Sequence, residues 1–156
     1  MTYEIVETIE IAATPQRVFR ALTDPAQLRA WWGDPAVCVA THWELDARVG
    51  SRWRSRWHWT TPDGRGEKGG GGARPDFEIG GEVLAVEPPR HLVCSWRDDR
   101  YPQVPLTTVR YELQATVTGV RVRVIHSGFG GPTPDFQDYR GGWALVLAKL
   151  KGHGET

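Results

Sequence analysis

Apolar and polar residues alternate along the start of the chain. Tyr3, Ile5, Ile9 and Ile11 fall on one side of an extended segment, with mostly polar residues opposite. This alternation predicts a strand with one buried face. It stops before Thr14 and Pro15, a helix-capping residue followed by the residue favoured at the first helical position. A helix is therefore expected to begin here.

Two short helices are predicted after this strand. The first carries an apolar stripe of Val18, Phe19, Ala21 and Leu22. A second start signal, Thr23-Asp24-Pro25, opens one or two further turns that carry Leu28, Trp31 and Trp32 and end at Gly33. Because Trp31 and Trp32 are consecutive, they cannot share a helix face. We expect one to close the end of a cavity and the other to lie nearer the surface.

Residues 35–128 show the period of strands. Val37, Val39, Thr41, Trp43 and Leu45 share one parity, and in the next segment Trp53, Trp57 and Trp59 lie opposite Arg52, Arg54, Arg56 and His58. Further strands are expected over residues 79–86 and through Leu92, Cys94 and Trp96. Two alternating runs on either side of Thr118-Gly119 predict a hairpin.

A glycine-rich segment interrupts the strands. It contains Pro62-Asp63-Gly64 and the run Gly69 to Gly72, and it is too poor in apolar residues to pack. A flexible hairpin loop is predicted at about residues 60–77.

The end of the chain has helical period. One stripe combines spacings of three and four residues: Phe136, Tyr139, Trp143, Leu147 and Leu150. We therefore expect one long C-terminal helix. The element order predicts a single α+β domain over residues 1–156, in which a curved antiparallel sheet of about six to seven strands wraps around that helix.

Charge and cysteine content narrow the class of protein. Nineteen basic residues balance nineteen acidic ones among 156, which argues against binding to nucleic acid or an anionic membrane. No stretch approaches the roughly 20 apolar residues that cross a bilayer, and residues 1–11 do not resemble a signal peptide. Cys38 and Cys94 are interpreted as buried free thiols, so a cytoplasmic location is expected.

Eight tryptophans stand against one methionine. So many indoles suit either an aromatic core or an aromatic-lined cavity. Trp53, Trp57 and Trp59 fit both interpretations, as does Trp143. The expected ligand-binding set is Trp32, Trp43, Trp53, Trp57, Trp96, His126, Phe136 and Trp143.

His126 is the one weak catalytic candidate. It shares parity with Val120, Val122 and Val124, so it faces inward if they do. It would then either orient a ligand or act as an acid or base, or it would be a structural histidine that fixes the turn at Gly128. A tyrosine hydroxyl, from Tyr101 or Tyr111, is a further polar candidate.

Other chemistry has little support in the sequence. No GxSxG, HExxH, P-loop or GxGxxG motif is present, and the remaining histidines show no ligand spacing. Neither a metal nor a cofactor is expected. Arg52, Arg54 and Arg56 are interpreted as solvated charges, with carboxylate or phosphate binding as the alternative.

Six segments resemble one known family. They are Asp24 to Gly33 ("DPxxLxxWW"), Gly50 to Arg54, Gly81 to Val93, Ser95-Trp96, His126 to Phe129 ("HSGF") and Gly142 to Leu150 ("GWxxxLxxLK"). Together they resemble the START-like (SRPBCC) superfamily, and within it the activator-of-heat-shock-protein-90-ATPase homologue family. Three features depart from the pattern: Ser51 replaces a glycine, His91 interrupts an Arg-Leu pair, and residues 65–76 form a glycine-rich insert.

The resemblance implies a helix-grip fold with a hydrophobic cavity between sheet and C-terminal helix. The leading hypothesis is a domain that binds a small apolar or amphipathic molecule without transforming it. One alternative is a polyketide cyclase or dehydratase-like enzyme that uses His126, and another is a chaperone-activator-like interaction module. The expected partner is a small hydrophobic molecule, with no nucleic acid and no membrane insertion. A homodimer could form through the insert hairpin.

Overall fold

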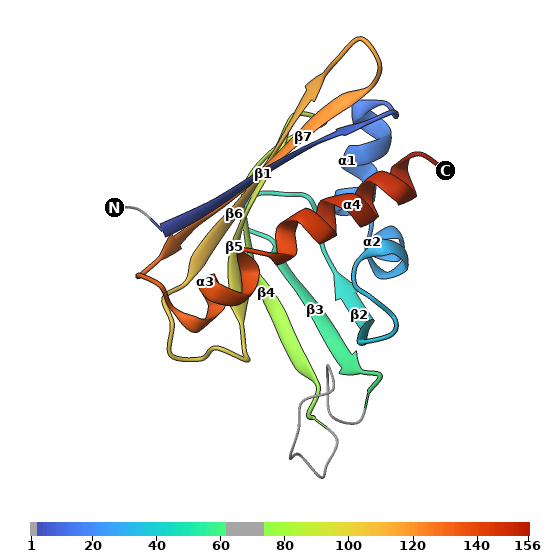
Figure 1. Cartoon of the computed structure of the whole chain (residues 1–156). Coiled ribbons are helices and arrows are strands. Elements are labelled where there is room, and N and C mark those ends of the chain that lie inside the picture. The colour runs from blue at the N-terminus through green and yellow to red at the C-terminus, as the bar shows by residue number, and fades with distance from the viewer. Residues whose placement is uncertain (1–2, 62–73) are drawn as a thin grey trace.

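The computed structural model describes residues 3–61 and 74–156. Figure 1 shows the order of its elements. They are β1 (Tyr3–Ile11), α1 (Pro15–Thr23), α2 (Pro25–Trp31), β2 (Cys38–Glu44), β3 (Arg52–Trp59), β4 (Phe77–Glu87), β5 (His91–Asp98), β6 (Thr107–Ala115), β7 (Val120–Phe129), α3 (Pro134–Tyr139) and α4 (Gly142–Gly154). The glycine-rich loop predicted at about 60–77 lies mostly outside these residues.

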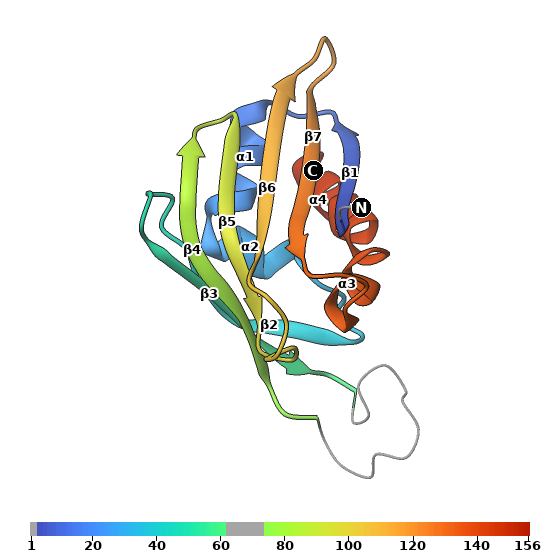
Figure 2. The ribbon, with the colours of Figure 1, turned by 90° about the vertical axis from the view of Figure 1, so that its left-hand side faces the viewer.

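One antiparallel sheet organises the molecule. Its strand order is β1-β7-β6-β5-β4-β3-β2, so β1 joins the last strand and every other neighbour follows in sequence. The predicted hairpin is β6–β7, with Ala115 paired to Val120. Figure 2 shows the sheet with α1 and α2 behind it. The prediction of a curved sheet covered by helices is confirmed.

The two short helices begin where the sequence predicts. The Thr14 hydroxyl accepts a hydrogen bond from the Arg17 amide at 3.1 Å, and the Asp24 carboxylate accepts one from the Ala26 amide at 3.1 Å. A proline follows each capping residue, and its fixed φ angle suits the first helical turn.

The C-terminal segment differs from the prediction of one long helix. It forms α3 and α4, with Arg140 and Gly141 between them. The consecutive glycines Gly141 and Gly142 weaken a continuous helix here, because glycine loses the most backbone freedom on helix formation. Phe136 and Tyr139 therefore lie on α3, separate from the buried Trp143, Leu147 and Leu150 of α4.

Strand parity was predicted correctly on the two strands that matter most for the site. Along β3, tryptophans are buried and arginines are exposed in strict alternation. Along β7, His126 is fully buried with Val120, Val122 and Val124. The buried faces and the helices enclose one core between them. No helix in the described ranges is long and apolar enough to cross a membrane.

Candidate ligand-binding site

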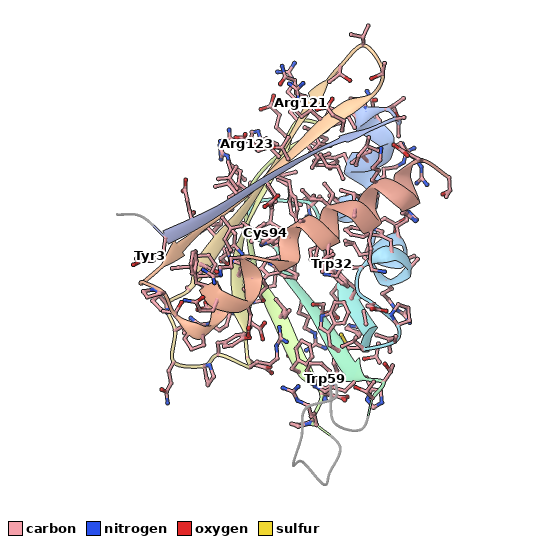
Figure 3. All side chains as sticks on the ribbon, viewed as in Figure 1. Tyr3, Trp32, Trp59, Cys94, Arg121 and Arg123 are labelled. Carbon is pink, nitrogen blue, oxygen red and sulfur yellow. The ribbon has the colours of Figure 1, made fainter. Side chains whose placement is uncertain are left out.

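An indole cluster lies between the sheet and the helices. Trp32, which follows α2, is its centre: its ring lies 5.1 Å from Trp31, 5.5 Å from Trp43 on β2, 5.7 Å from Trp143 on α4 and 6.0 Å from Trp96 on β5. Figure 3 shows Trp32 beside α4, whereas Trp59 lies at the far end of β3. Four elements thus contribute to one aromatic surface.

A small cavity adjoins this cluster. Its volume is about 20 Å³, enough for one water molecule. Its ten lining residues carry no charged side chain: Leu22, Leu28, Leu45, Leu92, Trp32, Trp43, Trp53, Trp96, Cys94 and Tyr111. Only Trp32 and Leu45 among them are partly exposed, so the route from solvent to the cavity passes these two side chains.

The buried indoles differ in their hydrogen bonds. Five of them donate their N–H group to the protein: Trp31 to the Ala21 carbonyl (2.8 Å), Trp53 to the Ser95 carbonyl (2.9 Å), Trp57 to Ser55 Oγ (3.0 Å), Trp96 to the Tyr139 hydroxyl (3.0 Å) and Trp143 to His126 Nδ1 (3.0 Å). Trp43 Nε1 is also buried, yet it has no partner in residues 3–61 and 74–156. A buried unpaired donor is unfavourable by about 1–3 kcal/mol.

Two other polar groups line the same cavity. They are the Tyr111 hydroxyl and the Cys94 thiol, and both residues are buried. Burial raises the pKa of Tyr111 well above its ordinary value and the pKa of Cys94 to about 12. Both groups are therefore neutral at physiological pH.

His126 lies beside the cluster, with both ring nitrogens hydrogen-bonded. The Trp143 indole can only donate, so Nδ1 of His126 is the acceptor and Nε2 carries the proton. Nε2 lies 2.8 Å from Thr107 Oγ1, and that hydroxyl donates to the Trp96 carbonyl at 3.1 Å. Burial lowers the pKa of His126 to about 3. A neutral imidazole with both nitrogens occupied suits a structural role better than acid–base chemistry.

A second polar network joins α3 to β5. Trp96 donates to the Tyr139 hydroxyl, which donates to the buried Asp98 carboxylate at 2.6 Å. Arg100 neutralises that carboxylate through contacts of 2.6 and 3.0 Å, and its guanidinium lies 4.2 Å from the centre of the Phe77 ring. Burial and the adjacent carboxylate raise the pKa of Tyr139 well above its ordinary value. This network holds Trp96 in place.

The structure brings together only part of the expected ligand-binding set. Trp32, Trp43, Trp53 and Trp96 line the cavity. Trp143 contacts Trp32 and Trp96 from α4 but does not line it. Trp57 packs farther along β3, with its ring stacked 6.2 Å from Phe77. Phe136 lies elsewhere, against Tyr3 and Phe129.

Sequence reasoning passed over Cys94 as an ordinary buried thiol and left the position of Tyr111 open. The alternation along β5 indicates that Cys94 is buried, because Cys94 shares a face with Leu92 and Trp96. Parity shows that such a residue is buried, but it does not show that the residue lines a cavity. The expectation for Trp31 and Trp32 also changes: Trp31 is buried and bonded to Ala21, while the partly exposed Trp32 is the one that lines the cavity.

A larger hollow of about 740 Å³ lies on the opposite, outer face of the sheet. Arg52, Arg54 and Arg97 share it with four acidic residues, and Arg54 pairs with Glu44 at 3.0 Å. Its charges are mixed, so its lining favours neither an anion nor a cation. No group of three or more metal-ligating side chains occurs in the described parts of the chain.

The curved sheet, the two short helices and the covering C-terminal helix define the helix-grip class of START-like (SRPBCC) proteins. The family model "Activator of Hsp90 ATPase homolog 1-like protein" matches residues 12–155. The chain belongs to this family. No curated protein matches the sequence.

Three solved structures illustrate the likeness in fold. Protein CV1439 from Chromobacterium violaceum is 23% identical, with 99% of this chain and 98% of that one covered and a TM-score of 0.79. The AHSA1-like protein from Aeromonas hydrophila is 21% identical, with 96% and 90% covered and a TM-score of 0.72. DynU16, a protein of the dynemicin biosynthetic locus, is 21% identical with a TM-score of 0.71; all of this chain is covered, but only 48% of DynU16.

Proposed function

We propose that this protein binds a small apolar or amphipathic molecule between the sheet and the helices, at the cavity lined by Trp32, Trp43, Trp53 and Trp96. In the structure the cavity holds one water-sized space, so a ligand enters by displacing an indole. Displacement of one large aromatic ring frees space of the size of a small aromatic molecule. The proposed function is therefore ligand binding that is coupled to opening of the cavity.

The observation that carries this proposal is the position of Trp32. Its ring contacts four other indoles, yet Trp32 is partly exposed and its indole makes no hydrogen bond to the described residues. It also follows the last residue of α2 and precedes Gly33, whose φ angle is +97°. Movement of this side chain breaks its aromatic contacts. It breaks no hydrogen bond between the indole and the described residues. Trp32 is the lining tryptophan that can move at least cost.

Binding without transformation fits the polar groups better than catalysis does. An acid–base enzyme would need a group that exchanges protons near neutral pH within reach of the ligand. His126 has a pKa of about 3, lies outside the cavity lining and donates and accepts within the protein. Tyr111 and Cys94 line the cavity but remain protonated at neutral pH.

The experiment is a titration of intrinsic tryptophan fluorescence with neutral aromatics, sterols, fatty acids and polyketide-like aromatics. We expect saturable quenching by at least one class. In Trp32→Ala the affinity for that class rises at least about fivefold, because the ligand no longer displaces the ring. Trp59→Phe is the control: Trp59 packs on Phe77 away from the cavity, so its replacement leaves affinity unchanged.

Two outcomes overturn the proposal. One is the absence of saturable binding in both the wild type and Trp32→Ala, each shown to be folded by circular dichroism. The other is equal loss of binding in Trp32→Ala and Trp59→Phe, which would locate the ligand outside this cavity. Trp32→Leu repeats the test if the alanine variant fails to fold.

A further inference from the structure

Three residues with uncharged polar groups, Trp43, Tyr111 and Cys94, line one apolar cavity. The indole N–H of Trp43 is buried and has no hydrogen-bond partner among residues 3–61 and 74–156. Each residue is more than nine-tenths buried: Trp43 is 7% exposed, and Tyr111 and Cys94 are each 4% exposed. Buried polar groups are nearly always hydrogen-bonded, so the unpaired N–H of Trp43 needs an explanation.

The three groups come from different parts of the sheet. Trp43 lies on β2 at one edge, Cys94 on the central strand β5 and Tyr111 on the adjacent β6. All three residues line the same cavity. The other buried indoles near them use their N–H groups within the protein. Trp43 thus differs from the buried indoles of Trp53, Trp96 and Trp143, which all donate hydrogen bonds.

The chemistry of these groups selects a ligand. The indole can only donate a hydrogen bond, a neutral phenol can donate or accept, and a thiol is a weak donor. A cavity with these groups suits a ligand oxygen atom that accepts hydrogen bonds. Its apolar surroundings suit an aromatic ring system in the same ligand. No lysine, arginine or histidine lines the cavity to neutralise an anion. Burial of an unpaired carboxylate would be strongly unfavourable.

We propose that the ligand is a neutral aromatic molecule with a carbonyl oxygen, and that this oxygen accepts hydrogen bonds from Trp43 and Tyr111. This inference rests on the proposed function, because the cavity must first open at Trp32. It excludes fatty acids and other carboxylates as preferred ligands. Trp43 and Tyr111 act as the residues that determine specificity.

Three naphthalenes of similar shape test the inference by isothermal titration calorimetry at neutral pH. They are 2-acetylnaphthalene (a neutral ketone), 2-ethylnaphthalene (no acceptor) and 2-naphthoate (an anion). We expect the ketone to bind about three- to tenfold more tightly than the hydrocarbon, the gain from one or two hydrogen bonds. The carboxylate should bind more weakly than the ketone, on the order of a hundredfold.

Two variants locate the interaction. Trp43→Phe and Tyr111→Phe each keep an aromatic ring and remove one polar group. Each should weaken ketone binding about threefold or more relative to its effect on hydrocarbon binding. Trp59→Phe is the matched control, because Trp59 packs on Phe77 and does not line the cavity.

The outcomes separate this inference from the proposed function. If the ketone and the hydrocarbon bind equally, or if 2-naphthoate binds most tightly, the ligand class is wrong while binding in the cavity stands. If the variants weaken both neutral ligands equally, the two groups do not select the carbonyl. If no naphthalene binds the wild type or Trp32→Ala, both proposals fail and the polar groups share a structural water.

Discussion

The indole nitrogen of Trp143 donates a hydrogen bond of 3.0 Å to Nδ1 of His126. This contact between α4 and β7 fixes the tautomer of the imidazole, and Thr107 completes the arrangement at Nε2. The ring packs against Phe129 at 4.5 Å, Tyr139 at 5.0 Å and Trp96 at 5.8 Å, none of which is charged at neutral pH. His126 therefore links the C-terminal helix to the sheet in its neutral form.

The first prediction concerns the pH dependence of stability. His126 has a folded-state pKa of about 3, below its ordinary value of 6.5, so between these values the unfolded chain binds more protons. The contribution of this residue is complete above about pH 6.5 and falls by about 1.4 kcal/mol per unit as the pH drops toward 3. Urea denaturation at about pH 7 and about pH 5 should therefore differ by about 2 kcal/mol more in the wild type than in His126→Gln.

His153→Gln is the control for this measurement, because His153 is far less buried and lies near the end of α4. It should keep most of the wild-type difference between the two pH values. An identical pH dependence in the wild type and His126→Gln would mean that His126 does not titrate as a buried neutral group.

The second prediction compares two indole N–H groups. Trp31→Phe leaves the Ala21 carbonyl without its donor and should lower the free energy of unfolding by about 1–3 kcal/mol beyond the loss of ring size. Trp43→Phe removes a donor that has no partner among the described residues, so this added loss should be absent. Chemical denaturation of both variants gives the difference. Equal destabilisation would show that Trp43 is hydrogen-bonded, for example to a buried water.

The third prediction tests the network between α3 and β5. Tyr139→Phe removes the hydroxyl that accepts from Trp96 and donates to Asp98, so two buried groups each lose a partner. The free energy of unfolding should fall by about 2–4 kcal/mol. Tyr101→Phe is the control, because its hydroxyl bonds to Asp138 in a more exposed position. A loss in Tyr139→Phe no larger than in this control would contradict the proposed role of the hydroxyl.

The fourth prediction concerns the close approach of β4 to β5. A Cβ atom at Gly81 would lie 2.1 Å from the Ser95 carbonyl oxygen, so Gly81→Ala forces the strands apart. We expect a loss of at least about 3 kcal/mol or failure to fold. Gly152→Ala, in α4 with nothing within 4 Å, should instead be neutral or stabilising by up to about 1 kcal/mol. A folded Gly81→Ala protein of wild-type stability would contradict this geometry.

Local patterns were sufficient to predict most of the fold. Thr14 and Asp24 marked both helix starts because capping and proline preferences act within a few residues. The inward position of His126 followed from its parity with the valines of β7. The break between α3 and α4 was missed because the apolar spacing from Phe136 to Leu150 continues across Gly141 and Gly142. Two glycines there outweighed the spacing.

The candidate site was less predictable. Parity identified Trp53 and Trp57 equally as buried, but only Trp53 lines the cavity, because the two lie at different positions along β3. Which indole lacks a hydrogen-bond partner depends on how the indoles from the helices and the sheet pack together. The assembled sheet brings three residues to the lining of one cavity: Trp43, Tyr111 and Cys94. No local pattern contains this arrangement.

The most direct test of opening at Trp32 is the ¹H–¹⁵N correlation spectrum of the tryptophan indoles during titration with 2-acetylnaphthalene. The account predicts that the resonances of Trp32 and Trp43 shift saturably with a common dissociation constant, and that the Trp43 signal moves in the direction of a new hydrogen bond. The resonance of Trp59, which packs on Phe77 away from the cavity, should stay in place. If the Trp32 and Trp43 signals remain unchanged at saturating ligand, the cavity does not open and the indoles form a closed core.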